Sequence, residues 1–242
     1  MSIHENLAVF AGRPARAFEP VFIPKIVCAP QPGSGEIFKF GIFGGVHGDE
    51  QAGSQACFEL IDWAGMRPRG LAGYELHFYP VCNPTGLHAR TRESHAGLDL
   101  NREFWKNSQQ PEVQFLEREL RRERYDGIIS LHADDTSDGV YGFVSGALLS
   151  QDILEPALAA AATVLPRNHS SVIDGFSASS GIISEGYTGI LSAPPEQRPQ
   201  ALEIVFETPA LAPLDTQVRA TVLAVKTMLA EFQQLQAYAA NL

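Results

Sequence analysis

The chain has 242 residues, 45% of them hydrophobic, and a formal net charge of −10. This composition is typical of a folded globular protein with a substantial core, and it excludes disordered, collagen-like and disulfide-stapled chains. The acidic balance disfavours nucleic acid and anionic membranes as partners, because phosphate contacts need clustered Lys and Arg. Three widely spaced cysteines indicate neither a disulfide framework nor a cysteine-based zinc site: Cys28, Cys57 and Cys82.

The N-terminus and the hydropathy of the chain bear on its location. Residues 1–13 lack both a basic segment and a long apolar core, so they make a poor signal peptide. No run of about 18 uncharged apolar residues is present, so no transmembrane helix is expected. We therefore expect a cytoplasmic protein with reduced thiols.

Strands and helices are predicted to alternate along the chain. Strands are expected at 37–43, 74–81, 127–132, 141–144 and 201–207, where β-forming apolar residues cluster. Helices are expected at 51–64, 111–124, 153–165 and 214–240, where apolar residues recur at helical spacing. This order predicts an α/β fold with a mixed, mostly parallel central sheet and helices on both faces, a three-layer sandwich. Without a repeat or an obvious linker, residues 1–242 are expected to form a single domain.

Ionisable side chains lie just after three of the predicted strands. His47 and Glu50 follow the first strand, His132 ends another, and Glu207 ends a third. In open α/β sheets, ligand sites form outside the carboxyl ends of the strands. A further polar cluster, residues 99–102, lies in the long loop that precedes residue 104, and such loops are usually functional or mobile.

The H-x-x-E pattern formed by His47 and Glu50 is a candidate metal site. An imidazole and a carboxylate three residues apart can both reach one divalent ion, at roughly 2.0–2.2 Å. The pattern is short and arises by chance, so a surface pair is the alternative. Flanking glycines, the strand end and the second histidine, His132, favour a metal. Two imidazoles and one carboxylate leave one zinc position open for water, as in catalytic sites.

Other polar residues could support such a site. Zinc-binding imidazoles need an acceptor for their second ring nitrogen, and three residues are candidates: Asp99, Asp134 and Asp135. Glu207 is either a catalytic base or a capping or ion-paired glutamate. Arg92 and Arg102 are either surface ion-pair partners or groups that bind a carboxylate and stabilise an oxyanion.

Four motifs together resemble the zinc carboxypeptidase family and its relatives, the aspartoacylase and succinylglutamate desuccinylase deacylases. They are GVHGDE at 45–50; NPTG at 83–86 with TRE at 91–93 and GLDLNR at 97–102; SLH at 130–132; and IVFETP at 204–209. The motifs follow the family's order and span about residues 40–210. The resemblance implies that His47, Glu50 and His132 hold one zinc ion per chain, with Asp99 hydrogen-bonded behind the first histidine.

The resemblance also implies roles toward a substrate. Arg92 matches the arginine that polarises the scissile carbonyl, and Glu207 matches the general base and acid. Asn101 and Arg102 match the pair that holds a free carboxylate of the substrate. Tyr187 lies about where these peptidases place a mobile tyrosine that covers the substrate.

Two departures from the family pattern concern the substrate. Asp49 stands where the digestive-type peptidases often carry Arg, and residues 133–135 (Ala-Asp-Asp) follow the second histidine where many members have Ser or Thr. His88 and His95 lie in the loop that carries the substrate motifs, and they are the remaining histidines with a possible role there.

The implied reaction is amide hydrolysis by a metal-activated water, and two enzymes fit it. The first is a metallocarboxypeptidase that removes the C-terminal residue of a small peptide. The second is a deacylase of N-acyl amino acids, and in both cases the substrate carries a free carboxylate. The chain ends soon after Glu207, without the extra C-terminal β domain of typical deacylases, which favours the peptidase. A catalytically inactive metal-binding module is the third hypothesis, and Glu207 and Arg92 argue against it.

Overall fold

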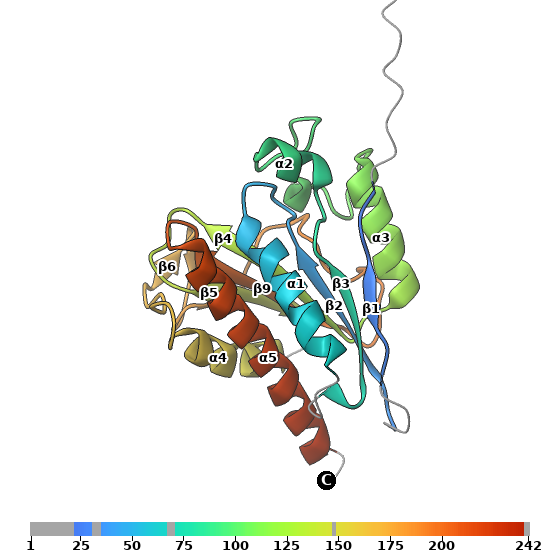
Figure 1. Cartoon of the computed structure of the whole chain (residues 1–242), viewed down its shortest axis with the longest axis vertical. Helices are drawn as coiled ribbons and strands as arrows, with labels where there is room; N and C mark the ends of the chain where they lie inside the picture. Colours follow the sequence, from blue (N-terminus) through green and yellow to red (C-terminus); the bar gives the residue numbers. More distant parts are fainter. Residues whose placement is uncertain (1–21, 31–34, 67–70, 147–148, 240–242) are drawn as a thin grey trace, which may run out of the picture.

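The computed structural model describes residues 22–30, 35–66, 71–146 and 149–239 (Figure 1). Its centre is a seven-stranded sheet in the order β1-β3-β2-β4-β9-β5-β8. The strands are β1 Ile26–Cys28, β2 Phe38–Gly44, β3 Tyr74–Tyr79, β4 Gly127–Asp134, β5 Tyr141–Gly146, β8 Ile182–Ile183 and β9 Leu202–Pro209. Strands β3, β2, β4 and β9 are parallel, whereas β1 and β5 run antiparallel to β3 and β9. The predicted mixed, mostly parallel sheet is therefore confirmed.

Helices cover both faces of the sheet. They are α1 Gln51–Gly65, α2 Pro84–Ala89, α3 Pro111–Glu123, α4 Leu149–Ala161 and α5 Leu214–Ala239. Figure 1 shows α1 and α5 in front of the sheet, and with α4 they pack on one hydrophobic cluster. Helix α3 belongs to a second cluster on the other face. The three predicted layers are present.

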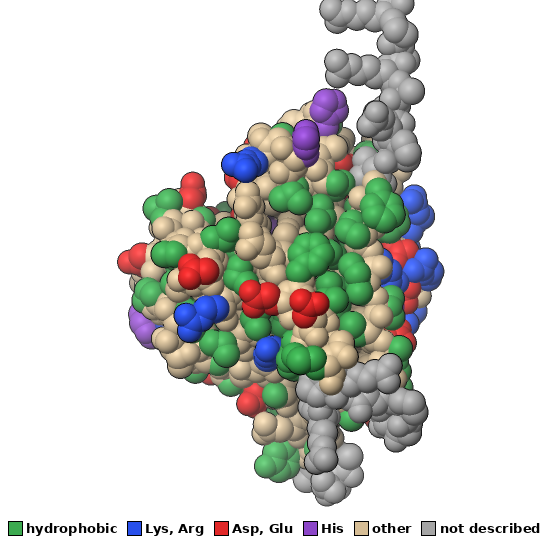
Figure 2. Space-filling view, in the orientation of Figure 1, with side chains coloured by type: hydrophobic (Ala, Val, Ile, Leu, Met, Phe, Trp, Pro, Cys, Tyr) green, Lys and Arg blue, Asp and Glu red, His purple; other side chains and the backbone are tan. Residues whose placement is uncertain are grey.

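The buried side chains explain why these elements form. In β2, Phe40 and Ile42 belong to the cluster under α1 and α5, whereas Phe43 belongs to the cluster under α3. A strand buried on both faces reads as a continuous apolar run, which is why the sequence predicts it well. Helix α5 buries the predicted stripe, including Val225 and Leu229. Figure 2 shows apolar side chains gathered beside α1 on the outer surface.

Some elements differ from the sequence prediction. Helix α4 ends at Ala161 rather than at residue 165, because the chain turns after it with a hydrogen bond from Val164 N to Ala161 O. The long loop before residue 104 contains α2 and a 3₁₀ turn, Leu100–Arg102. The short strands β1, β6 (Val172–Ile173), β7 (Phe176–Ser177) and β8 were not predicted. Residues 1–13, assessed above as a signal peptide, lie outside the described residues.

Candidate metal centre

Two motif loops pack against each other above the carboxyl ends of the parallel strands. A Cβ atom on Gly48 would stand 1.9 Å from the backbone carbon of Gly86, so neither loop could approach as closely with a larger residue. Asn83 caps α2 by accepting a hydrogen bond from Gly86 N at 2.9 Å. This loop packing fixes where His47 and Glu50, between β2 and α1, are presented.

Three side chains from these strand ends converge in a cluster, called the three-ligand cluster below. His47 Nδ1 lies 2.5 Å from Glu50 Oε1, and His132 Nδ1 lies 2.9 Å from Glu50 Oε2. The two Nδ1 atoms are 3.2 Å apart. All three side chains are buried, and Glu50 Oε2 also accepts a hydrogen bond from Ala133 N at 3.1 Å.

The donor set fits a divalent metal ion. Ligands placed tetrahedrally at about 2.0–2.2 Å from zinc stand roughly 3.3–3.6 Å apart. The separation of 3.2 Å between the two Nδ1 atoms is close to this value, whereas the carboxylate of Glu50 lies nearer to each imidazole. Two ring nitrogens 3.2 Å apart cannot both point a proton at each other, so at least one presents a lone pair. Neutral imidazole and carboxylate are typical zinc ligands. The sequence prediction that His47, Glu50 and His132 meet is therefore consistent with the geometry.

Asp99 bridges a histidine of the cluster and an arginine. Its Oδ1 accepts from His47 Nε2 at 3.0 Å, so in a neutral ring the lone pair that a metal ion would take is on Nδ1. Its Oδ2 accepts from Arg92 Nε and Nη2, both at 3.1 Å. Burial alone raises the pKa of Asp99, but the hydrogen bond with His47 and the charge of Arg92 outweigh it and hold the pKa below its usual range. Arg92 Nη1 also lies 3.2 Å from Glu50 Oε1.

The second histidine has a different anchor from the one predicted. Ser130 Oγ lies 2.9 Å from His132 Nε2 and fixes the ring from behind. Of the three candidates Asp99, Asp134 and Asp135, Asp99 contacts His47, whereas neither Asp134 nor Asp135 contacts His132. Asp134 ends β4, where the chain turns, and its Oδ1 instead accepts two 2.7 Å hydrogen bonds from the amide and hydroxyl of Thr136. Asp135 is exposed in the same turn.

Glu207 lies beside the cluster because of the strand register. It pairs with His132 across the parallel strands β4 and β9, and with Tyr141 across the antiparallel strands β9 and β5. Tyr141 donates its hydroxyl proton to Asp134 Oδ2 at 2.9 Å. Burial, followed by the negative charges of Glu50 and Asp134, raises the pKa of Glu207 well above its usual value. A bound divalent cation would act in the opposite direction.

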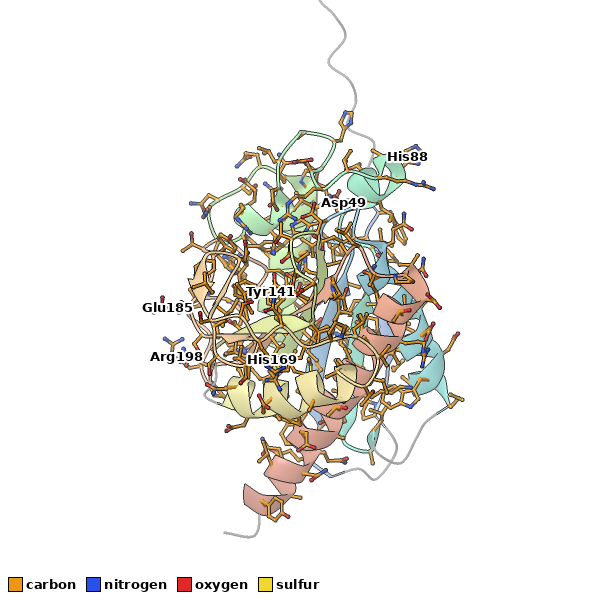
Figure 3. The ribbon with its side chains drawn as sticks, turned by 90° about the vertical axis from the view of Figure 1, so that its left-hand side faces the viewer. Asp49, His88, Tyr141, His169, Glu185 and Arg198 are labelled. Atoms are coloured by element: carbon orange, nitrogen blue, oxygen red, sulfur yellow. The ribbon has the colours of Figure 1, made fainter. Side chains whose placement is uncertain are left out.

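A cavity of about 450 Å³ opens over the cluster. It is lined by all the residues predicted to act on a substrate: Arg92, Asn101, Arg102, Tyr187 and Glu207. Asp49 and Tyr141 also line it, and Figure 3 shows both toward the middle of the molecule. His88 lies at the periphery of the same view and is exposed on α2, so it takes no part in the cavity.

The carboxylate-binding pair predicted from the sequence is held from two sides. Asn101 Oδ1 accepts a hydrogen bond from Leu191 N at 2.8 Å, which leaves its amide N–H groups available. The guanidinium carbon of Arg102 lies 3.8 Å from the centre of the Tyr187 ring. Arg102 Nη1 donates to Asn101 O at 2.8 Å, and no carboxylate in the described part of the chain forms an ion pair with Arg102. A cation therefore faces the cavity without an anionic partner.

A second group of potential metal ligands lies between β3 and α3. It consists of Glu75, His77 and Glu123. Lys25 and Lys39 reach Glu123 at 2.7 and 2.9 Å, so ammonium groups already neutralise this carboxylate. The group is therefore a buried ion-pair network rather than a second metal centre.

Three residues at the cavity or the cluster were not predicted to have a role. They are Ser130, Tyr141 and Asp174. Asp174 lies in the turn of the β6–β7 hairpin, and its pairing with Gly175 between apolar residues is a strong local signal for a two-residue hairpin. The Asp-Gly pair could therefore have been recognised in the sequence. The orientation of Tyr141 could not, because it depends on the pairing of β5 with β9.

Comparison with known proteins supports the interpretation of this cluster and cavity as the site of a hydrolase. The sequence profile of the succinylglutamate desuccinylase/aspartoacylase catalytic domain matches residues 38–174, which include His47, Glu50, Arg92, Asp99 and His132. The chain belongs to this family. Membership in the desuccinylase/aspartoacylase family, together with metallocarboxypeptidase-like relatives, supports a hydrolase of one of these two types.

One curated relative is a carboxypeptidase. The chain is 31% identical over 109 residues to carboxypeptidase SOL1 of Arabidopsis thaliana, a match that covers 38% of this chain. The match covers 22% of the length of that relative.

Solved structures share the fold of this family member. A candidate metallopeptidase from Shewanella denitrificans has a TM-score of 0.69 at 21% identity, covering 86% of this chain and 78% of that one. A metallo-carboxypeptidase from Pseudomonas aeruginosa, solved with (2-guanidinoethylmercapto)succinic acid, has a TM-score of 0.62 at 21% identity, covering 88% and 61%. Within the described ranges, no helix has the length and hydropathy needed to cross a membrane.

Proposed function

We propose that the chain is a metal-dependent amide hydrolase of the carboxypeptidase type, which removes the C-terminal residue of small peptides. One observation carries this proposal. A single cavity is lined by His47 and Glu50 of the three-ligand cluster, by Glu207 and by Arg102, which has no ion pair within the described residues. These are the groups needed to bind a metal, move a proton and orient an anionic substrate.

His47, Glu50 and His132 would hold one zinc ion. When bound, such an ion supplies a Lewis acid and lowers the pKa of a bound water toward 7. The hydrogen bonds from Asp99 and Ser130 fix the orientation of both imidazoles, which supports the ligand set.

Glu207 is proposed as the proton carrier. Its carboxylate takes a proton from the attacking water and then delivers it to the leaving amine. This double task needs a carboxylate within reach of both the water and the leaving amine, and Glu207 lines the same cavity as His47 and Glu50. Its position beside His132 in the sheet register brings it next to the cluster.

Arg92 is proposed to stabilise the negative charge that develops on the carbonyl oxygen. Its side chain is 40% exposed, lines the cavity and is held by two contacts with Asp99. A guanidinium fixed in this way needs little reorganisation when charge develops.

Arg102 and Asn101 are proposed to bind the free carboxylate of the substrate. A guanidinium matches a carboxylate with two parallel hydrogen bonds, and the amide of Asn101 adds a further donor. This contact would place the scissile bond in the cavity and convert binding energy into orientation.

The charge of the cavity favours a peptide over a substrate that carries two or three carboxylates, such as succinylglutamate. Six acidic side chains line it: Asp49, Glu50, Asp134, Asp135, Asp174 and Glu207. Of the two lining arginines, Arg92 is already paired with Asp99, so Arg102 is left for one substrate carboxylate. A substrate such as succinylglutamate brings three carboxylates and would meet repulsion from the remaining wall.

A substrate panel tests this proposal. Zinc-loaded protein is assayed for amine release from dipeptides and tripeptides with a free C-terminus, and from N-acetyl-, N-succinyl- and longer N-acyl amino acids. We expect peptides with neutral or cationic residues to be cleaved at least tenfold faster, in kcat/KM, than any N-succinyl amino acid. Faster cleavage of N-succinyl or N-acetyl amino acids would replace the peptidase by a deacylase. A parallel assay of Glu207→Gln excludes a contaminating peptidase.

A further inference from the structure

A short hairpin borders the cavity through its turn residue Asp174. Strands β6 and β7 pair antiparallel, with Ile173 opposite Phe176, and the turn residues Asp174 and Gly175 have φ values of 50° and 80°. Two consecutive positive φ values are typical of the tight two-residue turn that matches the twist of paired strands. Ile173 is buried, so the hairpin is anchored to the body of the protein.

The hairpin contacts the ring of Tyr187. Phe176 and Tyr187 have ring centres 4.8 Å apart at an angle of 89°, an edge-to-face contact. Phe143 on β5 supports both rings, at 5.9 Å from Phe176 and 6.3 Å from Tyr187. The hydroxyl of Tyr187 also donates to Asp174 O at 3.4 Å. The ring is therefore held by aromatic packing and by one long hydrogen bond to the turn.

The same ring contacts Arg102. The guanidinium carbon lies 3.8 Å from the ring centre, well inside the range of a cation–π contact. The segment that carries Tyr187 is tied to the loop of Arg102 by a hydrogen bond from Phe104 N to Gly189 O at 3.0 Å. The hairpin therefore contacts the ring of Tyr187, and this ring in turn contacts the guanidinium of Arg102.

We propose that Phe176 is a positioning residue: it holds the ring of Tyr187 against Arg102, so that the guanidinium is oriented for the substrate carboxylate before the substrate binds. Phe176 itself touches neither the reacting atoms nor the cluster. That Arg102 binds a carboxylate of the substrate rests on the function proposed above. The contacts of Phe176 with Tyr187 and of Tyr187 with Arg102 do not depend on that function. An oriented guanidinium loses less conformational freedom on binding than a mobile one, which raises affinity.

The first experiment needs no ligand and no metal. The side-chain methylene protons of Arg102 are followed by NMR, with Arg102→Lys used for assignment, because the Tyr187 ring current shifts them upfield. We expect Phe176→Ala to move these signals toward the values of a free arginine, and Phe176→Tyr and Tyr187→Phe to keep them. Val172→Ala is the matched control, since Val172 is on the same hairpin and 61% exposed.

The second experiment measures binding to the metal-free protein, which cannot turn the probes over, by calorimetry with benzoyl-glycyl-alanine and its C-terminal amide. The wild type is expected to bind the acid more tightly than the amide. Phe176→Ala should lose about three- to tenfold of this preference, as expected for loss of one positioned cation–π contact. Phe176→Tyr should restore the preference, a rescue that a merely structural role of the hairpin does not require.

The outcomes separate the two proposals. Unshifted Arg102 signals in Phe176→Ala, or an unchanged preference for the acid, overturn the positioning role. A wild type that binds both probes equally overturns it as well. If the acid is preferred and the preference depends on Phe176, but no peptide is hydrolysed, the positioning role stands and the proposed peptidase function fails.

Discussion

His132 and Glu207 are register partners on β4 and β9, so an imidazole of the three-ligand cluster and a carboxylate leave adjacent strands side by side. Parallel pairing directs both side chains to the same face of the sheet. A carboxylate placed this way has no hinge between itself and the cluster. Its separation from His132 is set by the spacing of two paired strands.

The first prediction concerns Glu207. Glu207→Gln keeps the shape of the side chain but removes the proton acceptor, so kcat should fall by about 10²–10⁴-fold, the usual contribution of general acid–base catalysis. Bound zinc, measured by elemental analysis, should stay at one ion per chain. Glu196→Gln, at a side chain that is 64% exposed, is the control and should leave kcat unchanged. Full activity of Glu207→Gln would remove it as the base.

The second prediction concerns the metal. The wild type should bind one zinc ion per chain, and a chelator should lower its melting temperature, because a ligand at a thousandfold excess over its Kd stabilises the native state by about 4 kcal/mol. His132→Ala should bind zinc poorly and lose most of this chelator response. His88→Ala alters an exposed histidine outside the cavity and should respond like the wild type. Equal zinc content in wild type and His132→Ala would contradict the assigned ligands.

The third prediction concerns the loop contact that presents His47. Gly48→Ala places a Cβ atom 1.9 Å from the backbone of Gly86, so one loop must move. Overpacking of this kind costs about 1–3 kcal/mol of unfolding free energy, and zinc affinity should fall with it. Gly65→Ala, at the end of α1, meets no atom within 4 Å and should be neutral or slightly stabilising. Urea denaturation and zinc titration of both variants measure the difference.

The fourth prediction concerns acid stability. Burial opposes the charge of Glu123, but hydrogen bonds from Lys25, Lys39 and Arg122 outweigh it and lower its pKa. A carboxylate with a lowered folded-state pKa stabilises the protein fully above its unfolded pKa of about 4.3, and this contribution is lost as pH falls through the folded value. Glu123→Gln should therefore cost about 2 kcal/mol at pH 7 and less as the pH falls below 4.

Urea denaturation across this pH range measures the effect of Glu123→Gln. Glu59→Gln, at an exposed position on α1, serves as the control and should follow the wild type at every pH. A constant difference between Glu123→Gln and the wild type from pH 7 to the acid limit would refute the role of the Glu123 charge.

The sequence predicted the main sheet and the cluster because both are encoded locally. Central parallel strands such as β2 are buried on both faces and read as apolar runs, and His47 and Glu50 are only three residues apart. The proximity of His132 to these two residues was predicted because all three lie at the ends of predicted strands, not from any residue pattern that links them. Two-residue strands such as β6 and β7 carry no periodicity and could be found only through their turn.

Contacts between distant segments were beyond sequence reasoning. Leu191 N reaches the side chain of Asn101 across 90 positions, and nothing in either motif indicates that partner. Asp134, one of three candidate partners for a histidine, is engaged locally instead, since the turn after β4 offers it Thr136 as a nearer donor. Chain pairing and turn geometry, rather than residue type, determine the hydrogen-bond partners of Asn101 and Asp134.

Asp99 orients two different groups, the imidazole of His47 and the guanidinium of Arg92, through one side chain. Its two oxygens serve His47 and Arg92 separately, so any substitution there disturbs the basicity of an imidazole and the aim of a guanidinium together. Neither can be retuned alone by changing this residue. Substitutions that adjust His47 or Arg92 independently must therefore arise at other positions.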